Sequence, residues 1–404
     1  MCEADEFATA VVGAGGHWPH PPALWSYSSL REAEECPRRW MLSRATYPSI
    51  WGRKGYPSRP ILPALIGEVA HRTIELIIRA LHDRGCESMT GQCAVDALRE
   101  LGGYTSLVRR AIADQVTRLH GNPRVEHQLP RLATALGAQV PDIRHRIQAI
   151  VARTSLSPAP SRTRLTGGAT TRARISSGSH PEVDLRAERL RFSGRVDLLT
   201  VDEGVCRIID FKTGAADAHH TDQMRTYALL WTHDRDLNPQ GLPVASLTLS
   251  YTTHQVDVDP PQQGELIALE DELLKRVSGA EAALTMRPPP ARPAAEMCRR
   301  CDVRHICEDY WAGPGANLVA AASGLRPEFL DCEAVVIGRN GARSWMIELE
   351  PDQSLALLRT ATETPTFEAG TRLRLLDVAH MKDMDTDRRI LTTTQWSEVY
   401  PLEA

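Results

Sequence analysis

The sequence has little lysine, no long apolar run and no phosphate-binding glycine loop. Lys and Arg together number 47, but the lysines are Lys54, Lys212, Lys275 and Lys382 alone, so a lysine inside a motif stands out. No apolar run reaches the roughly 18 residues that a membrane-spanning helix needs, so we expect no membrane association. The N-terminus lacks a basic start followed by an apolar stretch, so we expect a cytoplasmic rather than a secreted protein.

The missing glycine loop also limits the mechanism. Without a Gly-rich segment ending in Gly-Lys-Ser/Thr there is no helicase motif, so unwinding of a nucleic acid would need a partner protein. The stretch Gly13-x-Gly15-Gly16 follows no clear strand and gives only weak support for a dinucleotide cofactor. A net charge of −4 excludes a protein that is basic all over, but it is compatible with a local basic groove.

Hydrophobic periodicity divides the 404 residues into four regions. We expect a mostly disordered lead-in over 1–24, an α/β domain over 25–312, a linker over 313–330 and a small β domain over 331–404. Within the α/β domain the spacing predicts helices over 63–81, 92–120, 219–234 and 262–284 and strands over 183–190, 191–201, 205–212 and 244–252.

Two of the predicted strands end in acidic residues. Gly194-Arg195-Val196-Asp197 ends one strand, and Asp210-Phe211-Lys212-Thr213-Gly214 ends the next. Because side chains alternate along a strand, Asp210 and Lys212 face the same side. Carboxylates on neighbouring strands can share a hard cation such as Mg²⁺, and a lysine beside them can orient a water or neutralise charge on a phosphate.

Two predicted helices carry polar residues that face the same region. Gln223 and Tyr227 are four residues apart, so they share one helix face. His71 lies on the apolar side of its helix together with Gly67 and Ile74, so it faces the sheet and could be a third protein ligand. Each residue taken singly has an ordinary structural explanation, and the ordered combination is what indicates a metal-dependent site.

This ordered set resembles the RecB/Cas4-like branch of the PD-(D/E)XK nuclease superfamily across roughly residues 26–311. The resemblance implies a restriction-endonuclease-like core of helix, three strands, helix and strand, with helical insertions. It also implies a DNA nuclease that uses Mg²⁺ or Mn²⁺. The residues that would hold this metal are His71, Asp197, Asp210 and the Phe211 carbonyl. Lys212 would be catalytic, supported by Gln223 and Tyr227.

The cysteines suggest a second metal centre. Cys298-x-x-Cys301-x₅-Cys307 is a tight triplet that needs a fourth ligand: His305 for zinc, or a distant cysteine for an iron–sulfur cluster. Cys36, which precedes Pro37, is the best candidate cysteine, and ordinary thiols are the remaining alternative. The resemblance extends to this pattern and implies a [4Fe–4S] cluster. The other cysteines, which we expect to be buried thiols in a reducing compartment, are Cys2, Cys86, Cys93, Cys206 and Cys332.

Basic residues outside these motifs are candidate DNA contacts. The stretch between Asp142 and Glu182 has no acidic residue, and its Ser-, Pro- and Gly-rich middle reads as a flexible loop. The arginines that we expect to guide the DNA backbone are Arg38, Arg39, Arg162, Arg164, Arg172 and Arg174.

The C-terminal region is expected to be rich in strands. The pattern predicts strands over 331–337, 343–350, 371–379 and 389–394, with a short helix over 352–360. Strand number and turn spacing suggest an OB-like barrel that could bind single strands. The alternative is a small β domain that packs on the nuclease or on a partner.

Three functions are compatible with these patterns. The first is a metal-dependent deoxyribonuclease acting in DNA repair, recombination or phage defence, on substrates that include single-stranded ends and with a helicase or other repair or defence protein as partner. The second is a catalytically silent iron–sulfur module that binds DNA or a partner, which the complete acid–lysine set argues against. The third is an iron–sulfur redox or sensing protein.

Overall fold

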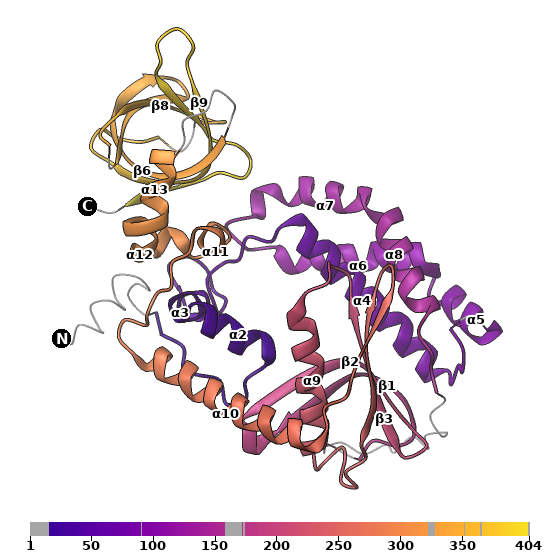
Figure 1. Ribbon diagram of the computed structural model, residues 1–404. Helices are drawn as coiled ribbons and strands as arrows, with labels where there is room; N and C mark the ends of the chain where they lie inside the picture. The colour runs from indigo at the N-terminus through magenta and orange to yellow at the C-terminus, as the bar shows by residue number, and fades with distance from the viewer. Residues whose placement is uncertain are drawn as a thin grey trace. The chain divides into compact units, whose positions relative to one another are not determined.

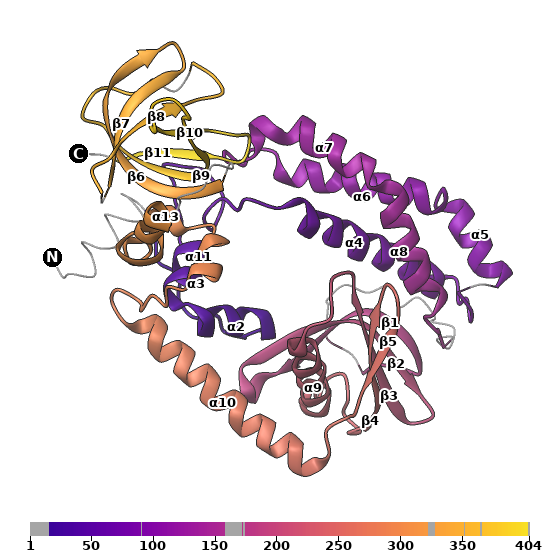
Figure 2. The same cartoon turned by 45° about the horizontal axis from the view of Figure 1, so that its top comes forward.

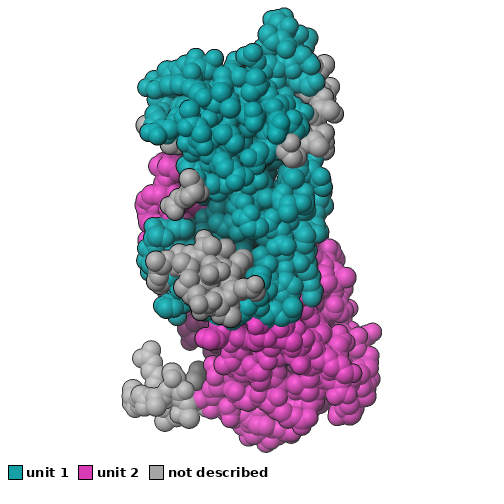
Figure 3. Space-filling view, turned by 90° about the vertical axis from the view of Figure 1, so that its left-hand side faces the viewer, with its two compact units in different colours: residues 1–19, 35–57, 286–404 teal, residues 20–34, 58–285 magenta. Residues whose placement is uncertain are grey.

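The protein is described by a computed structural model that covers residues 16–89, 91–157, 172, 174–321, 328–350, 352–363 and 366–402. The chain forms two compact units, which Figure 3 colours separately. Unit 1 combines residues 1–19, 35–57 and 286–404, and unit 2 combines residues 20–34 and 58–285. Each unit is therefore built from segments that are far apart in the sequence. The predicted domain limits remain predictions.

Unit 2 contains a mixed five-stranded sheet in the order β1-β2-β3-β4-β5 (Figures 1 and 2). Its strands are β1 Gly178–Ala187, β2 Phe192–Asp202, β3 Val205–Lys212, β4 Val244–Tyr251 and β5 Gln255–Val258. Neighbouring strands are antiparallel except for β3 and β4, which are parallel. Parallel strands need a crossover, and helix α9, Ala218–His233, provides it. The carboxyl ends of β3 and β4 consequently lie side by side.

The turn between β2 and β3 explains why these strands form a hairpin. Glu203 and Gly204 have φ angles of 50° and 80°, the left-handed values that a two-residue hairpin turn requires. Along β3 the residues Cys206, Ile208 and Asp210 are buried at every second position, as the predicted alternation requires. The hairpin therefore sets the carboxyl end of β3 opposite the middle of β2.

Unit 2 also contains a layer of helices that lies beside the sheet (Figure 2). These helices are α4 Leu62–Asp83, α5 Gln92–Glu100, α6 Gly103–Leu119, α7 Leu129–Ala138 and α8 Val140–Ala152, with η1 at Glu126–Gln128. Their buried side chains form one core cluster that also includes Leu198 of β2 and Phe211 of β3. The apolar stripe of α4 is part of this cluster, which explains the helical spacing of Leu65, Val69 and Ile77 in the sequence.

Other helices of unit 2 come from both ends of its sequence. Helix α2 spans Tyr27–Glu35, helix α10 spans Gln263–Thr285, and the short helix η2 spans Glu188–Leu190. Arg276 of α10 forms a two-pronged contact with Glu34 of α2, with N–O distances of 2.8 and 2.9 Å. Such a fork-to-fork pair holds the N-terminal helix to the long C-terminal one.

Unit 1 contains a β-barrel near the C-terminus (Figure 1). Its strands are β6 Glu328–Gly341, β7 Ser344–Glu350, β8 Leu355–Arg359, β9 Arg372–Lys382, β10 Arg389–Thr392 and β11 Glu398–Leu402. The sheet order is β10-β8-β7-β6-β9-β11, and β10 also pairs with β9, which closes five strands into a ring. Trp345 and Phe367 pack edge to face in its core, with ring centroids 5.2 Å apart.

Short helices occupy the rest of unit 1. They are α3 Pro37–Arg44, α11 Ala295–Arg299, η3 Arg304–Ile306, α12 Glu308–Tyr310, a π-helical turn η4 at Trp311–Gly315, and α13 Ala316–Ala321. A buried ion network joins this part to the barrel. Arg304 Nε lies 2.6 Å from Asp331 Oδ2, Arg304 Nη2 lies 2.8 Å from Asp377 Oδ2, and the Tyr310 hydroxyl donates to Asp331 at 2.8 Å. The segment that carries the late cysteines is thereby held against β6 and β9.

Several expectations about local structure are wrong. The segment expected to be a helix over 352–360 contains β8, because its alternating apolar residues pair with β7 and β10. The helix expected over 92–120 is broken at Gly102 and Gly103, whose φ angles of 84° and 78° end α5 and begin α6. Cys36 is the N-cap of helix α3, which is separate from α2.

The structure describes part of the expected lead-in and part of the expected linker. Residues 1–15 lie outside the described residues, but His17 is placed by two hydrogen bonds with Thr46, of 2.8 and 3.0 Å. The linker expected over 313–330 is helical to Ala321, and β6 begins at Glu328. The sequence analysis did not identify α7, α8, β5 or β11. In the described part of the chain, no helix is long and apolar enough to cross a membrane.

Cys86 and Cys93, which we expected to be thiols, form a disulfide. Cys86 follows the end of α4 and Cys93 lies in the first turn of α5, and their Cα atoms are 5.6 Å apart. This separation is within the range that a disulfide spans, so the short connection between two packed helices creates the pair. Spacing alone could not reveal it, because it depends on how the helices meet.

Candidate functional site

The two acids of the sequence motifs lie next to each other in unit 2. The expectation that Asp197 ends its strand is wrong, because β2 continues to Asp202, whereas Asp210 does lie near the end of β3. Leu198 of β2 pairs with Ile209 of β3 in the antiparallel register. The next residues along the two strands, Asp197 and Asp210, therefore lie opposite each other on the same face of the sheet. Asp210 is 4% exposed. The Asp197 carboxylate accepts a hydrogen bond of 2.6 Å from the Phe211 backbone N–H. The predicted juxtaposition of these two carboxylates is therefore present in the structure.

Burial of two neighbouring acids creates an electrostatic problem. Burial, and then the Asp210 carboxylate, raise the pKa of Asp197 well above its usual range, while the hydrogen bond from Phe211 opposes this shift. Two like charges this close are unfavourable away from water unless a cation neutralises them. The pair therefore has the charge that a divalent cation would compensate.

Lys212 is held between Asp210 and helix α9. Its Nζ lies 2.6 Å from Asp210 Oδ2 and donates a 2.9 Å hydrogen bond to Gln223 Oε1. Gln223 Nε2 in turn donates to the Tyr227 hydroxyl at 2.7 Å. Asp210 Oδ2 is buried, and Lys212 is its ion-pair partner among the described residues. A divalent cation would compensate the charge of this oxygen if the carboxylate turned away from the lysine.

His71 reaches this region from α4. Its Nδ1 lies 3.8 Å from Asp197 Oδ1. Burial lowers the pKa of His71, whereas the Asp210 carboxylate and a hydrogen bond to the Phe211 backbone raise it. A lowered pKa favours the neutral imidazole, which is the form that binds metals. The structure thus brings His71, Asp197, Asp210 and Phe211 into one neighbourhood, as the sequence motifs predicted.

The donor chemistry of this neighbourhood suits a hard divalent cation. It consists of two carboxylates, one backbone carbonyl and one imidazole, and Mg²⁺ and Mn²⁺ prefer oxygen-rich sites of this kind. As the described side chains are placed, however, no three His, Cys, Asp or Glu residues are close enough together to form a metal site. Asp197 is turned toward the Phe211 N–H and Asp210 toward Lys212, so these acids would have to turn toward a cation.

Glycines in the motifs allow α9 to pack closely on β2 and α4 to approach the residue that follows β3. A Cβ atom added to Gly194 would lie 2.7 Å from Tyr227 Cε1 and 3.1 Å from Leu230 Cδ1. A Cβ added to Gly67 of α4 would lie 3.2 Å from Thr213 Oγ1. The spacing Gly194-x-x-Asp197 therefore has a packing reason: the missing side chain makes room for the tyrosine ring beside the acids.

We expect Gly194→Ala to destabilise unit 2 by about 1–3 kcal/mol, the usual result of forcing a methyl group into a packed site. The free energy of unfolding from chemical denaturation measures this effect. Gly137→Ala is the matched control, because Gly137 lies in α7 with nothing within 4 Å of its added Cβ. The control should be neutral or stabilising by about 0.5–1 kcal/mol. Equal stabilities of the two variants would contradict the packing argument.

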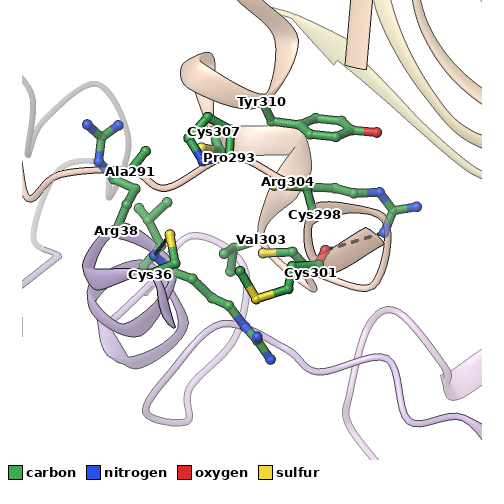
Figure 4. A pocket seen from close by; sticks show the side chains of 13 residues that line it. Cys36, Arg38, Ala291, Pro293, Cys298, Cys301, Val303, Arg304, Cys307 and Tyr310 are labelled. Atoms are coloured by element: carbon green, nitrogen blue, oxygen red, sulfur yellow. Dashed lines mark hydrogen bonds between the residues drawn. The ribbon is translucent and has the colours of Figure 1, made fainter. Parts of the chain in front are cut away.

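The four cysteines of the predicted cluster line one pocket in unit 1. Figure 4 shows Cys36 at the start of α3 and Cys298, Cys301 and Cys307 on the facing segment, around a shared space that Arg38 also lines. All four are free thiols. Burial raises the pKa of Cys301 to about 12 and that of Cys307 to about 11. The pocket thus gathers four thiols in a mostly apolar surrounding.

Backbone N–H groups and arginines support the sulfur atoms. Cys36 Sγ accepts from the Arg39 N–H at 3.4 Å, and Cys298 Sγ accepts from the Ala294 N–H at 3.3 Å. The positive charge of Arg39 lowers the pKa values of Cys298 and Cys301, opposing the effect of burial. Such contacts favour thiolates, which are the ligand form of cysteine. The donor set therefore fits a four-thiolate centre, although the sulfur atoms are not close enough together to form one as placed.

His305 does not join the thiols. Its Nε2 is 2.8 Å from the Tyr56 hydroxyl, and its ring stacks on Tyr400 with centroids 4.0 Å apart and planes 16° apart. It is not among the residues that line the pocket. The arrangement favours Cys36 over His305 as the fourth ligand.

The candidate DNA contacts are placed differently from one another. Arg38 is 6% exposed and is bound to the Pro289 carbonyl at 2.6 Å and to Asp309 at 3.0 Å, so it cannot contact DNA as a surface residue. Arg172 forms an ion pair of 2.5 Å with Asp234, and Arg174 donates to Gln240 at 2.7 Å. We expected both guanidinium groups to contact DNA phosphates, but in the structure each of them binds a side chain of the protein.

Three further arginines complete the set of candidate DNA contacts. Arg39 lines the cysteine pocket and is paired with Glu35 at 3.8 Å. Arg162 and Arg164 lie outside the described residues. Sequence composition identified basic residues, but it could not show which of them are consumed by internal ion pairs.

The site also contains residues that the sequence analysis missed. Tyr251 ends β4 beside Lys212, and His220 of α9 is 2.8 Å from its hydroxyl. The general tendency of functional residues to gather at the carboxyl ends of parallel strands would have pointed to Tyr251. His220 had no such signal, because its position depends on how α9 packs.

Comparisons with known proteins add a family. The model of the PD-(D/E)XK nuclease superfamily matches residues 24–308. None of the curated proteins compared matches the chain. Among solved structures, the tetrameric p202 HIN2 is 16% identical over 22% of this chain and 46% of its own, so about half of that structure's length is spanned, with a TM-score of 0.18. A murine DNA-binding protein bound with double-stranded DNA is 8% identical over 56% of this chain and 95% of its own, also with a TM-score of 0.18. At these TM-scores the likeness supports no conclusion.

Proposed function

Because this chain belongs to the PD-(D/E)XK nuclease superfamily, we propose that it is a divalent-cation-dependent deoxyribonuclease of the RecB/Cas4-like branch. The observation that carries this proposal is the meeting of Asp197, in the middle of β2, with Asp210 and Lys212 at the carboxyl end of β3. Two buried acids and a lysine in contact form an unfavourable arrangement for mere stability, and perturbed groups of this kind gather at functional sites. The reaction is hydrolysis of a DNA phosphodiester bond.

The residues divide the chemical tasks among them. His71, Asp197, Asp210 and the Phe211 carbonyl would hold Mg²⁺ or Mn²⁺. When bound, this cation polarises the phosphate and lowers the pKa of an attacking water. Lys212 supplies a positive charge where negative charge builds up on the phosphate oxygens. Gln223 and Tyr227 hold the lysine amine in place through the 2.9 and 2.7 Å hydrogen bonds, which reduces the cost of orienting it.

A [4Fe–4S] cluster bound by Cys36, Cys298, Cys301 and Cys307 is the second part of the proposal. The shared pocket supports it, because four thiols from two distant segments line one space. The role of the cluster would be structural: a link between residue 36 and the segment 298–307 restricts the unfolded chain and so favours the folded one.

The C-terminal barrel is proposed to be OB-like. Support comes from its closed ring, in which β6 pairs with β7 and β9 while β10 pairs in parallel with β8. Its role in binding DNA or a partner protein, such as a helicase or another repair or defence protein, is an extension of the same proposal. So is a cytoplasmic location.

Digestion of labelled DNA tests the proposed activity. The purified chain, with its metal content determined, should cut single- or double-stranded oligonucleotides in Mg²⁺ or Mn²⁺ and not in EDTA. Cleavage should return when the divalent cation is restored. A chain that binds DNA but leaves it intact with every divalent cation would instead be a catalytically silent binding module, and the proposal would be wrong.

A further inference from the structure

A rigid aromatic stack lies beside the catalytic lysine. Tyr251, the last residue of β4, pairs with Lys212, the last residue of β3, in the parallel register. The ring of His254 stacks on the ring of Tyr251, with centroids 5.0 Å apart and planes 14° apart. Tyr251 is 4% exposed whereas His254 is exposed, so the outer face of the imidazole is open to solvent at the edge where the proposed reaction takes place.

The turn that carries this stack is held in place. The Tyr251 N–H donates to the His254 carbonyl at 2.9 Å, which closes the turn between β4 and β5. Thr253 Oγ1 and His254 Nδ1 are 2.9 Å apart, which orients the imidazole. Arg153 of α8 donates to the carbonyls of Tyr251 and Thr252, the latter at 2.8 Å. A ring fixed in this way loses little conformational freedom when a ligand stacks on it.

Both the polar side of the stack and its charge surroundings connect it to the site. The Tyr251 hydroxyl is 2.8 Å from Nδ1 of His220. Burial, and then the charge of Lys212, lower the pKa of His220, whereas the carboxylates of Asp217 and Asp210 raise it. Arg146 of α8 donates to the Thr213 carbonyl at 3.4 Å, just after Lys212. The carboxyl ends of β3 and β4 are therefore flanked by Lys212, Arg146 and Arg153. This is a combination of basic groups and aromatic faces, which is typical of single-strand binding.

We propose that the His254–Tyr251 stack is a platform for an unpaired base of single-stranded DNA next to the phosphate that is cut. The inference rests on the proposed nuclease function and names the substrate class of that site. Inside a duplex, both faces of each base are covered by its neighbours, so a side chain can stack on a base there only where the strand is unpaired. The exposed imidazole face accepts any base, because every base offers a π face.

Binding in EDTA separates this inference from cleavage. The full chain is titrated into single-stranded and duplex oligonucleotides that carry the fluorescent base analogue 2-aminopurine at successive positions, and anisotropy and quenching are recorded. The parent should bind the single strand more tightly and should quench the analogue at one preferred position. His254→Ala should weaken single-strand binding about 5- to 150-fold, which corresponds to the usual contribution of stacking one base, and should abolish the quenching.

Two further variants make the result specific. His254→Phe keeps an aromatic face and should retain most of the affinity and the quenching. His127→Ala is the matched control, because His127 is an exposed histidine of η1, and it should bind as the parent does. Equal binding by the parent and His254→Ala, or tighter binding of the duplex by the parent, would overturn the platform. Adding Mg²⁺ to the same samples tests the nuclease proposal separately, since a parent that fails to cut refutes that proposal whatever the stacking shows.

Discussion

Lys212→Ala and Asp210→Asn should each abolish most DNA cleavage while leaving the fold intact. Lys212 forms an ion pair with Asp210, and removal of one such positive group from a preorganised site costs on the order of 10²–10³-fold in rate. Asp210 is a proposed cation ligand, and loss of several kcal/mol of charge stabilisation corresponds to about 10³-fold or more. Single-turnover cleavage of labelled oligonucleotides at saturating Mg²⁺ measures both effects.

The pKa shifts make Asp210→Asn an informative variant. Burial, and then the neighbouring Asp210 carboxylate, raise the pKa of Asp197. When folding raises the pKa of an acid, the folded protein loses stability as the pH rises above the pKa that the acid has in the unfolded chain. Removing the Asp210 charge relieves this repulsion but also removes the ion-pair partner of Lys212. Because the two effects oppose each other, the cation-free variant should unfold close to the temperature of the parent near neutral pH. Loss of cleavage could then not be attributed to unfolding.

Lys275→Ala is the control for the lysine variant. Lys275 is an exposed residue of α10, so this change removes a lysine without touching the acids. It should cut DNA at the rate of the parent. If Lys212→Ala also cut at that rate, Lys212 would have no part in the reaction and the proposed mechanism would be wrong.

Cys36→Ser should remove most of the iron from the protein and lower its stability markedly. The thiol of Cys36 belongs to a distant segment of the same pocket, so its loss leaves three cysteines that are close together in sequence. The three remaining cysteines cannot link residue 36 to the segment 298–307. By analogy with a disulfide, the loss of a link that closes such a long loop lowers the free energy of unfolding by roughly 2–5 kcal/mol. Iron and sulfide analysis, the visible absorbance spectrum and thermal unfolding of anaerobically purified protein measure these effects.

A buried cysteine elsewhere supplies the control. Cys206 of β3 is a free thiol in unit 2 and does not line the pocket, so Cys206→Ala should keep the iron content of the parent. A parent that contains zinc and no iron would replace the cluster with a zinc site. A parent that contains neither metal would leave the four cysteines as ordinary thiols and would refute the cluster proposal.

Local sequence patterns were sufficient for β1 to β4 and for the acid–lysine motif. The period of two over β3 placed Asp210 and Lys212 on one face, and Glu203 and Gly204 marked the hairpin turn. The same reasoning failed for 352–360, because five residues of short apolar spacing fit a helix or a strand and only pairing with β7 and β10 decides between them. Short elements depend on their neighbours for most of their stability.

The sequence predicted where strands and helices lie better than it predicted which charged side chains pair with each other inside the fold. The sequence shows that Arg38 and Arg172 are basic, but the structure assigns their charges to Asp309 and Asp234. Likewise, the stack of His254 on Tyr251 and the contact of His220 with Tyr251 join residues from different elements. No periodicity in one segment can predict a contact whose distance is set by the packing of another.

By itself, the sequence determined the mixed α/β class, the family and the residue types of both candidate centres, because residue identity and spacing within one element suffice for these. The tertiary structure decided which groups meet: His71 with Asp197, Cys36 with the late cysteines, and Cys86 with Cys93. The reason is physical. A strand or helix sets the direction of its own side chains through backbone geometry, whereas the distance between side chains of different elements is set by how the cores pack, which involves the whole chain at once.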